Sequence, residues 1–110
     1  MRRVNESLRE VIAEEVSRLK DPGLGFVTIT AVDTSPDLRA ARVYYSVLGD
    51  DDQREQTADA LERATSRIRA ATGDQVRLKY LPALSFHYDT AIERGLRMER
   101  LLKELDDDDA

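Results

Sequence analysis

His87 and Asp89 are the residues whose types and spacing come nearest to a catalytic pair in this sequence. His87 is the only histidine of the chain, and the aspartate follows two positions later in the segment LSFHYD. In a strand, both side chains would lie on one face with their Cβ atoms about 7 Å apart. Catalysis would also require a nucleophile or bound water and a pocket, and no neighbouring pattern supplies them. We therefore interpret this segment as a strand leading into a helix, and expect no enzymatic activity.

The composition argues against several other kinds of site. The chain has no cysteine and one histidine, so disulfides, thiol chemistry and a structural zinc site are not expected. The five glycines are scattered rather than gathered in a phosphate-binding loop. Neighbouring acids such as Glu14 and Glu15 signal little in a chain that is 35% charged. We predict no metal site.

A basic stretch in the middle of the chain is the remaining candidate site. Between positions 63 and 79 there is a single acid, Asp74, and there are five basic residues: Arg63, Arg67, Arg69, Arg77 and Lys79. These side chains suit contact with the phosphate backbone of a nucleic acid, which would make binding depend on salt. The same pattern fits the solvated face of a helix, and the residues alone do not choose between the two interpretations.

The acidic residues are concentrated in two runs. The net charge at pH 7 is −5, and seven of the acids lie at positions 50–52 and 106–109. Setting those seven aside changes the balance from −5 to +2. The distribution of charge therefore matters more than its sum. One hypothesis for the acidic surface is solubility in a salt-rich cytosol.

Length and hydropathy predict one small globular domain. A chain of 110 residues is typical of a single domain and buries roughly two-thirds of its unfolded surface. We place the domain at residues 1–105 and expect the acidic tail, residues 106–110, to be disordered. The first residues lack an apolar signal-peptide core, and no apolar run approaches the ~18 residues of a membrane span. With no cysteine present, these features favour a cytoplasmic protein.

The first half of the chain predicts a helix and two strands. Residues 4–19 have the apolar spacing of an amphipathic helix, which Asp21-Pro22-Gly23 ends. Residues 25–34, GFVTITAVDT, alternate as in a strand, with one face formed by Val27, Ile29 and Ala31 and the other by Phe26, Thr28, Thr30 and Val32. Residues 41–49, ARVYYSVLG, predict a second strand. A short polar loop joins the two, so we expect antiparallel pairing.

The second half predicts a long helix, a third strand and a last helix. Residues 52–72 contain neither proline nor glycine, and Gly73 suits the position just after a helix end. At Ala64-Thr65-Ser66 the hydroxyls can bond back to earlier carbonyls and kink the axis. LSFHYD is the third strand, and Thr90 with Glu93 matches a capping box that opens the last helix. This order predicts a two-layer α+β domain in which helices cover a three-stranded sheet.

Three segments, in this order, resemble the ribosome-binding factor A family. They are RVNESLREVIAEEV, then DPGLGFVTITAVDTSPDLRAARVYYSVLG, then IRAATGDQVRLKYLPALSFHYDTAIERGLRM, and together they extend over residues 3–102. The resemblance implies a type II KH-like fold, helix-strand-strand-helix-kink-helix-strand, followed here by a C-terminal helix. That order agrees with the elements expected from the residue patterns.

The resemblance also implies a function. A member of this family binds the free 30S small ribosomal subunit or its 16S rRNA precursor as a non-catalytic assembly factor. It assists late maturation, including processing of the 16S rRNA 5′ end, and release is linked to a ribosome-associated GTPase. We accordingly expect a cytoplasmic monomer with no cofactor, no small-molecule substrate and no membrane partner.

The resemblance places the RNA-binding residues near the middle of the long helix. KH domains clamp the nucleotide backbone with a G-x-x-G loop between two helices, and this family has Ala-x-Gly there. The matching residues here are Ala64-Thr65-Ser66, so the glycine that allows close backbone approach is replaced. We therefore expect RNA contacts from side chains: Arg63, Thr65, Ser66, Arg67 and Arg69 first, then Arg77 and Lys79. The alternative is a protein-interaction module that contacts basic ribosomal proteins through its acidic surface.

Overall fold

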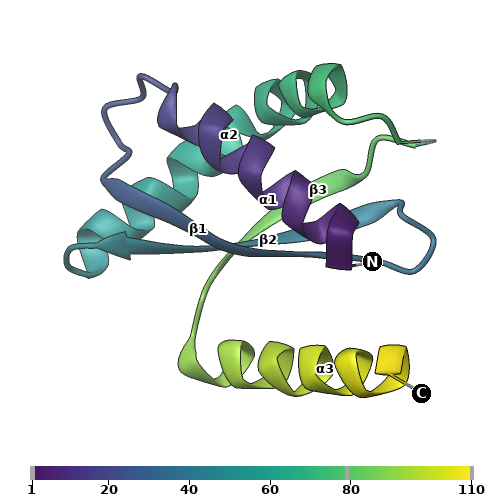
Figure 1. Ribbon diagram of the computed structural model, residues 1–110. Helices are drawn as coiled ribbons and strands as arrows, with labels where there is room; N and C mark the ends of the chain where they lie inside the picture. Colours follow the sequence, from purple (N-terminus) through teal and green to yellow (C-terminus); the bar gives the residue numbers. More distant parts are fainter. Residues whose placement is uncertain (1, 79, 110) are drawn as a thin grey trace.

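The computed structural model describes residues 2–78 and 80–109, with the side chains of 107–109 left out (Figure 1). Its elements follow the order α1 (Arg2–Ser17), β1 (Phe26–Thr34), β2 (Ala40–Leu48), α2 (Asp51–Gln75), β3 (Ala83–Tyr88) and α3 (Ala91–Asp109). This order of helices and strands confirms the α+β architecture predicted from the sequence.

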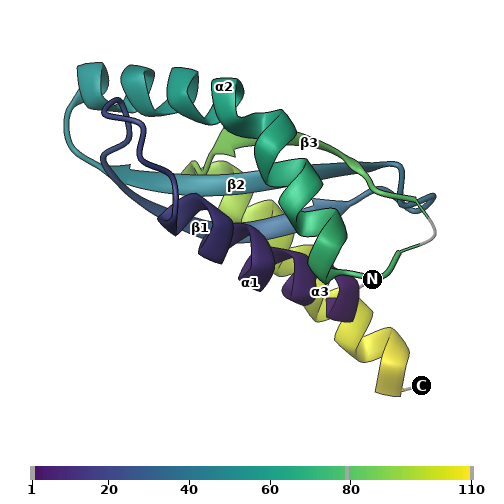
Figure 2. The same cartoon turned by 90° about the horizontal axis from the view of Figure 1, so that it is seen from above.

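The sheet has the strand order β1-β2-β3, with β2 in the centre. β1 and β2 pair antiparallel, as their short connection predicts, and β2 and β3 pair parallel. A parallel neighbour needs a crossover, and α2 supplies it by returning the chain across one face of the sheet (Figure 2). α2 therefore lies directly over the sheet and shares a layer with α1.

A β-bulge in β1 changes which residues face the core. Ile29 pairs with Tyr45 and Ala31 with Tyr44, so Thr30 is an extra residue without a partner of its own. The bulge shifts the alternation by one position. Ile29 and Val32 consequently both join the buried core. The strict alternation predicted for this strand, with Ala31 on the same face as Ile29 and Val32 on the other face, is wrong beyond Thr30.

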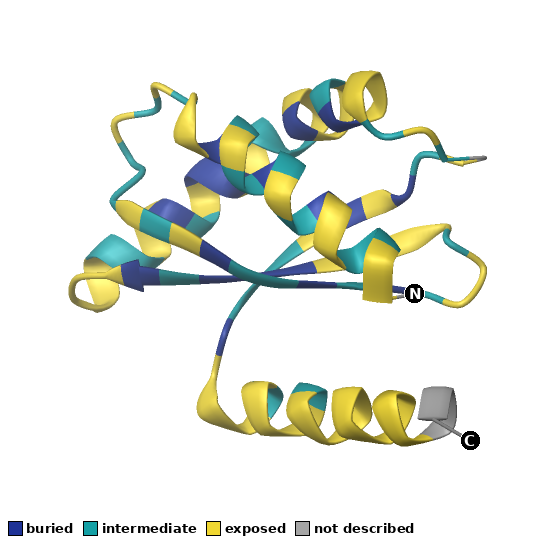
Figure 3. Cartoon of the chain, in the orientation of Figure 1, coloured by how far each residue is buried: buried dark blue, intermediate teal, exposed yellow. Residues whose placement is uncertain are grey.

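The core lies between the sheet and the layer formed by α1 and α2. α1 contributes Leu8, Ile12 and Val16, and α2 contributes Leu61 and Ile68. The strands add aliphatic side chains and a tyrosine: Ile29, Val32, Ala41, Val43, Tyr45 and Leu84. Figure 3 shows the buried residues of these helices and strands on the surfaces that face one another. This is the two-layer packing expected from three strands covered by helices.

α2 is continuous but bent. The Asp50 carboxylate caps its start by accepting from the Gln53 N–H at 2.9 Å, and Figure 2 shows the helix axis changing direction about halfway along. In that region the Thr65 hydroxyl donates to the Leu61 carbonyl at 2.8 Å, a side-chain bond that bends helices. The expected kink is thus present as a bend that leaves the helix unbroken.

Gly73 does not end α2 as predicted, because the helix runs through it to Gln75. The extended backbone of Val76 ends the helix, and its N–H donates to the Thr72 carbonyl at 3.0 Å. Gly73 instead makes room for Leu81, since a Cβ there would lie 2.9 Å from the Leu81 Cδ2 atom. The glycine therefore marks a close approach to the following loop rather than a left-handed turn.

α3 lies on the opposite face of the sheet from α1 and α2, which adds a layer to the two-layer core (Figure 1). The Thr90 hydroxyl caps its start by accepting from the Glu93 N–H at 3.1 Å, as the capping-box pattern predicts. The backbone is helical to Asp109. The tail predicted to be disordered, residues 106–110, includes Ala110 and the side chains of 107–109, which lie outside the described residues.

Candidate nucleic-acid interface

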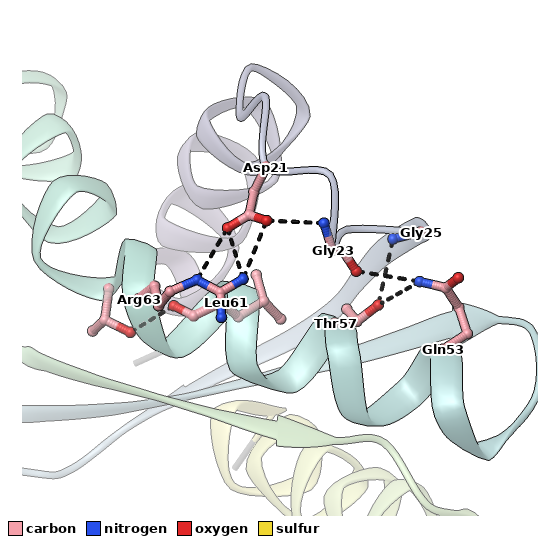
Figure 4. Close-up of polar contacts among 8 residues, drawn as sticks. Asp21, Gly23, Gly25, Gln53, Thr57, Leu61 and Arg63 are labelled. Atoms are coloured by element: carbon pink, nitrogen blue, oxygen red, sulfur yellow. Dashed lines mark hydrogen bonds and ion pairs between the residues drawn. The ribbon is translucent and has the colours of Figure 1, made fainter.

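Arg63, at the centre of the predicted site, is held in an ion pair with Asp21. Its Nη2 lies 3.2 Å from Oδ1 and 3.0 Å from Oδ2, and its Nε lies 3.3 Å from Oδ2 (Figure 4). The Gly23 N–H donates to the same carboxylate at 2.9 Å. These two donors hold the pKa of Asp21 below its usual range. Arg63 therefore fastens the α1–β1 loop to α2, and its charge is already balanced.

Arg69 also has a structural role. Its Nη2 donates to the Leu81 carbonyl at 2.7 Å and its Nε to the Pro82 carbonyl at 3.0 Å. These bonds fix the loop between α2 and β3 against the second half of α2. A guanidinium satisfied by two backbone carbonyls keeps its full positive charge, so it still contributes to the local field.

Arg67 and Arg77 are the predicted arginines that remain available. Both are exposed, and neither side chain forms an ion pair or hydrogen bond with another described residue. Ser66, directly before Arg67, is exposed as well. Thr65 is half-buried and its hydroxyl is engaged with the helix backbone. Lys79 lies outside the described residues.

The structure adds two residues that the sequence analysis missed. The guanidinium of Arg39, in the β1–β2 connection, lies 4.5 Å from the centre of the Tyr80 ring. The Ala83 N–H donates to the Arg39 carbonyl at 2.9 Å, which holds this connection beside the α2–β3 loop. Tyr80 is 42% exposed. An aromatic ring among basic side chains is the kind of surface on which single-stranded bases stack. In the sequence, this surface was indicated by the tyrosine that follows the basic residues Arg77 and Lys79.

The backbone of the interface restricts how it can hold a phosphate. α2 is helical through positions 64–66, so the N–H groups there are hydrogen-bonded within the helix. A KH loop offers free backbone N–H groups at the corresponding place, and this helix does not. Contact with a phosphate at this point must therefore come from side chains, chiefly Arg67 and the Ser66 hydroxyl.

His87 and Asp89 do not form a catalytic unit. The His87 Nε2 lies 2.8 Å from the Ser85 hydroxyl, and burial together with the charge of Arg42 lowers the pKa of His87. The Asp89 carboxylate accepts from Arg97 at 2.9 Å instead. A cavity of about 220 Å³ lies between α1, β1 and α3, and neither His87 nor Asp89 lines it. The segment is a strand leading into a helix, as its pattern indicates.

Asp89 is the buried anchor of α3. Its side chain has no exposed surface, and a second arginine, Arg94, places Nε 3.4 Å from Oδ2. Burial by itself would raise the pKa of Asp89, but the hydrogen bond from Arg97 and the charges of Arg97 and Arg94 outweigh it and lower the pKa. The aspartate therefore stays ionised and holds the last helix to the sheet.

Neither a metal-binding cluster nor a membrane-spanning helix occurs among the described residues. No group of three or more histidine, aspartate or glutamate side chains is placed to hold a metal ion. None of the described helices is long and apolar enough to cross a membrane.

The sequence and the fold are both similar to known proteins. A family model described as ribosome-binding factor A matches residues 1–102. The ribosome-binding factor A of Geobacter sulfurreducens is 47% identical over 107 residues, which cover 93% of this chain and 91% of that protein. The protein of the same name from Halothermothrix orenii is 40% identical over 109 residues, which cover 98% of this chain and 89% of that protein.

Two solved structures share the fold. The crystal structure of ribosome-binding factor A from Thermus thermophilus has a TM-score of 0.71 at 34% identity, and the match covers 78% of this chain and 92% of that one. A homology model of the Thermus thermophilus protein, fitted into a cryo-EM map of a 30S complex, has a TM-score of 0.65 at 35% identity. That match covers 76% of this chain and 88% of the fitted one.

Proposed function

Because the chain belongs to the ribosome-binding factor A family, we propose that it binds the free 30S small ribosomal subunit and its 16S rRNA precursor. The observation that carries this proposal is the pair of exposed arginines, Arg67 and Arg77, which form no ion pair with another described residue. The fitting of the Thermus thermophilus relative into a map of a 30S complex supports the same partner.

Arg67 and Arg77 bind phosphate groups and thereby position the protein on the RNA. Guanidinium–phosphate hydrogen bonds are charge-assisted and fix orientation without reading sequence. Ser66 adds a hydroxyl donor next to Arg67, and Lys79 adds a positive charge two positions after Arg77 in the sequence. Tyr80, beside Arg39, offers its exposed ring to an unpaired base. Arg63 and Arg69 serve the fold first. Arg69, bonded to neutral carbonyls, still attracts RNA through its charge, whereas the charge of Arg63 is balanced by Asp21.

The protein acts without catalysing a reaction. Asp89 is neutralised by Arg97 and Arg94, so it does not activate His87 as a base. The protein assists late maturation, including processing of the 16S rRNA 5′ end, by holding the precursor in a conformation that a nuclease accepts. It works as a cytoplasmic monomer without a cofactor, and a ribosome-associated GTPase promotes its release.

Co-sedimentation tests this proposal. The purified protein is centrifuged with free small subunits, large subunits and assembled ribosomes in salt from about 50 to 500 mM, because every phosphate that the protein neutralises makes affinity fall more steeply with salt. We expect binding to free small subunits alone, and it should weaken steeply with salt. Absence of binding at the lowest salt, or equal binding to all three particles, would refute the proposal. A complex with the released ribosomal proteins that survives ribonuclease treatment, together with no binding to the free rRNA, would favour the protein-interaction module instead.

A further inference from the structure

α3 turns its charged side toward the sheet. Arg97 and Arg94 pair with Asp89, and the Arg100 Nη1 lies 2.7 Å from the Asp33 Oδ2 atom in β1. The Arg97 guanidinium also lies 4.2 Å from the centre of the Tyr44 ring. An amphipathic helix usually packs through its apolar side. Here the contacts to the sheet are made mainly by arginines, so the apolar side is left without a partner among the described residues.

The uncovered apolar side forms a stripe along α3. Positions 98, 102 and 105 are spaced by four and three residues, which places them along one line of a helix. Leu101, beside them, lines the cavity between α1, β1 and α3 instead. We call Met98, Leu102 and Leu105 the α3 stripe; they are 55%, 59% and 43% exposed. Figure 3 shows α3 exposed along almost its whole described length.

A second exposed apolar pair lies on the same side of the sheet. Phe26 and Leu48 are direct partners in the β1–β2 ladder and are 82% and 76% exposed. Their neighbours Val27 and Val47 pack toward α1 and α2, so Phe26 and Leu48 point to the face on which α3 lies. Arg100 of α3 reaches Asp33, seven residues along β1 from Phe26, so this pair and the α3 stripe lie at different ends of the same face. Exposed apolar surface of this kind commonly marks a protein contact.

Acidic residues flank both parts of this surface. Asp50, Asp51 and Asp52 follow Leu48 within four positions, and the second acidic run begins at Asp106, directly after the α3 stripe. Such a surface repels RNA phosphates. A partner with apolar side chains and positive charge satisfies both features.

We propose that the α3 stripe, with Phe26 and Leu48, binds a basic amphipathic segment of a protein: lysines or arginines toward the aspartates, and leucine-like side chains against the stripe. This goes beyond the proposed function. The RNA-binding arginine Arg67 lies on α2, on the other side of the sheet (Figure 1). The protein would then hold RNA with one face and a basic protein with the other.

The test is a titration of the protein with a synthetic peptide. Ribosomes are left out, so that the result does not depend on RNA binding. The probe is a helical peptide of about five turns with leucines on one side and lysines on the other. Its binding is measured by fluorescence anisotropy. Its matched control has glutamates in place of the lysines. Leu48→Ser and Leu102→Ser each remove an exposed side chain, so the fold should persist. Leu96→Ser is the control variant, because Leu96 is 52% exposed on the same helix but about 2.5 turns from Leu105, on the opposite side.

The lysine peptide should bind the wild-type chain, and each of Leu48→Ser and Leu102→Ser should weaken that binding about tenfold. Leu96→Ser should leave it unchanged. Asp51→Asn with Asp52→Asn should weaken it and reduce its dependence on salt. The proposal is overturned if the peptide does not bind or the glutamate peptide binds equally. It is also overturned if Leu96→Ser has the same effect as Leu102→Ser, or if sedimentation shows a dimer that the serine variants abolish. A negative peptide titration would not change the co-sedimentation result. The protein-binding proposal can therefore be refuted without refuting binding to the small subunit.

Discussion

Arg97 of α3 donates a hydrogen bond of 2.9 Å to the Asp89 carboxylate at the end of β3, and neither side chain has more than about a tenth of its surface exposed. Among the described residues, the pair is the most buried ionic contact between α3 and the rest of the fold. The exposed ion pair between Arg100 and Asp33 adds a second point of attachment. Since exposed pairs contribute little, the docking of α3 depends chiefly on Asp89.

Replacing Asp89 by asparagine should release α3 from the sheet. Removing one partner of a buried ion pair costs about 3–5 kcal/mol when the other charge stays buried. In this fold the free-energy cost is avoided if α3 leaves the sheet, because the charge of Arg97 is then hydrated by solvent. We therefore expect amide hydrogen exchange in residues 91–105 to accelerate at least tenfold, while β1 and β2 keep their protection. Glu99→Gln, the same change of charge at an exposed position of α3, is the control. Unchanged exchange in the Asp89→Asn variant would show that α3 is held by other contacts.

His87 should make the stability of the domain depend on pH near neutrality. Burial and the charge of Arg42 lower its pKa below the ordinary value of 6.5. In the window just below pH 6.5 the unfolded chain binds a proton that the folded chain does not, so the free energy of unfolding falls as pH falls. Above pH 6.5 this contribution is complete. Urea unfolding at several pH values between 7.5 and about 5 measures the slope, and His87→Gln should remove it while leaving subunit binding at pH 7.5 intact. The same slope in the variant would contradict the assignment.

Ser66 tests whether α2 is continuous at the place where the family has a glycine. The position is exposed and helical, so Ser66→Gly should lower the free energy of unfolding by about 0.5 kcal/mol, and Ser66→Ala should raise it by a similar amount. A broken helix would reverse this order, because glycine relieves strained backbone. Urea unfolding of the two variants gives the answer, and a more stable glycine variant would mean that the helix is interrupted.

Local sequence patterns were enough to predict the helices and strands. They failed where contacts between residues distant in the sequence determine the structure. Apolar spacing, the placing of proline and glycine, and a capping pattern together predicted the helices and strands, but the extra residue at Thr30 follows from the pairing of β1 with β2. Gly73 was predicted to end the helix because glycine is common just after helix ends. Its actual role, to allow the close approach of Leu81, cannot be seen in the sequence. The site shows the same limit. Nothing in the sequence distinguishes Arg63 from Arg67 as an RNA-binding residue. Only the fold places Asp21, 42 positions away, in contact with Arg63.

Arg67 and Arg77 should carry the salt-dependent part of subunit binding. Arg67→Glu and Arg77→Glu each change the net charge from −5 to −7, and neither breaks an ion pair with a described residue. The fold should therefore persist, which melting curves can verify. In co-sedimentation with free small subunits we expect each variant to bind at least tenfold more weakly and to lose about one unit of the slope of log K against log salt.

Lys103→Glu is the matched control for these two reversals. It produces the same net charge at an exposed position of α3, on the other side of the sheet from α2. If net charge alone governed binding, all three variants would weaken it equally, because general repulsion from the rRNA would be the same. If local phosphate contacts govern it, Lys103→Glu keeps both the affinity and the salt slope of the wild type. Wild-type binding by the Arg67→Glu, Arg77→Glu double variant would place the RNA contact elsewhere on the domain.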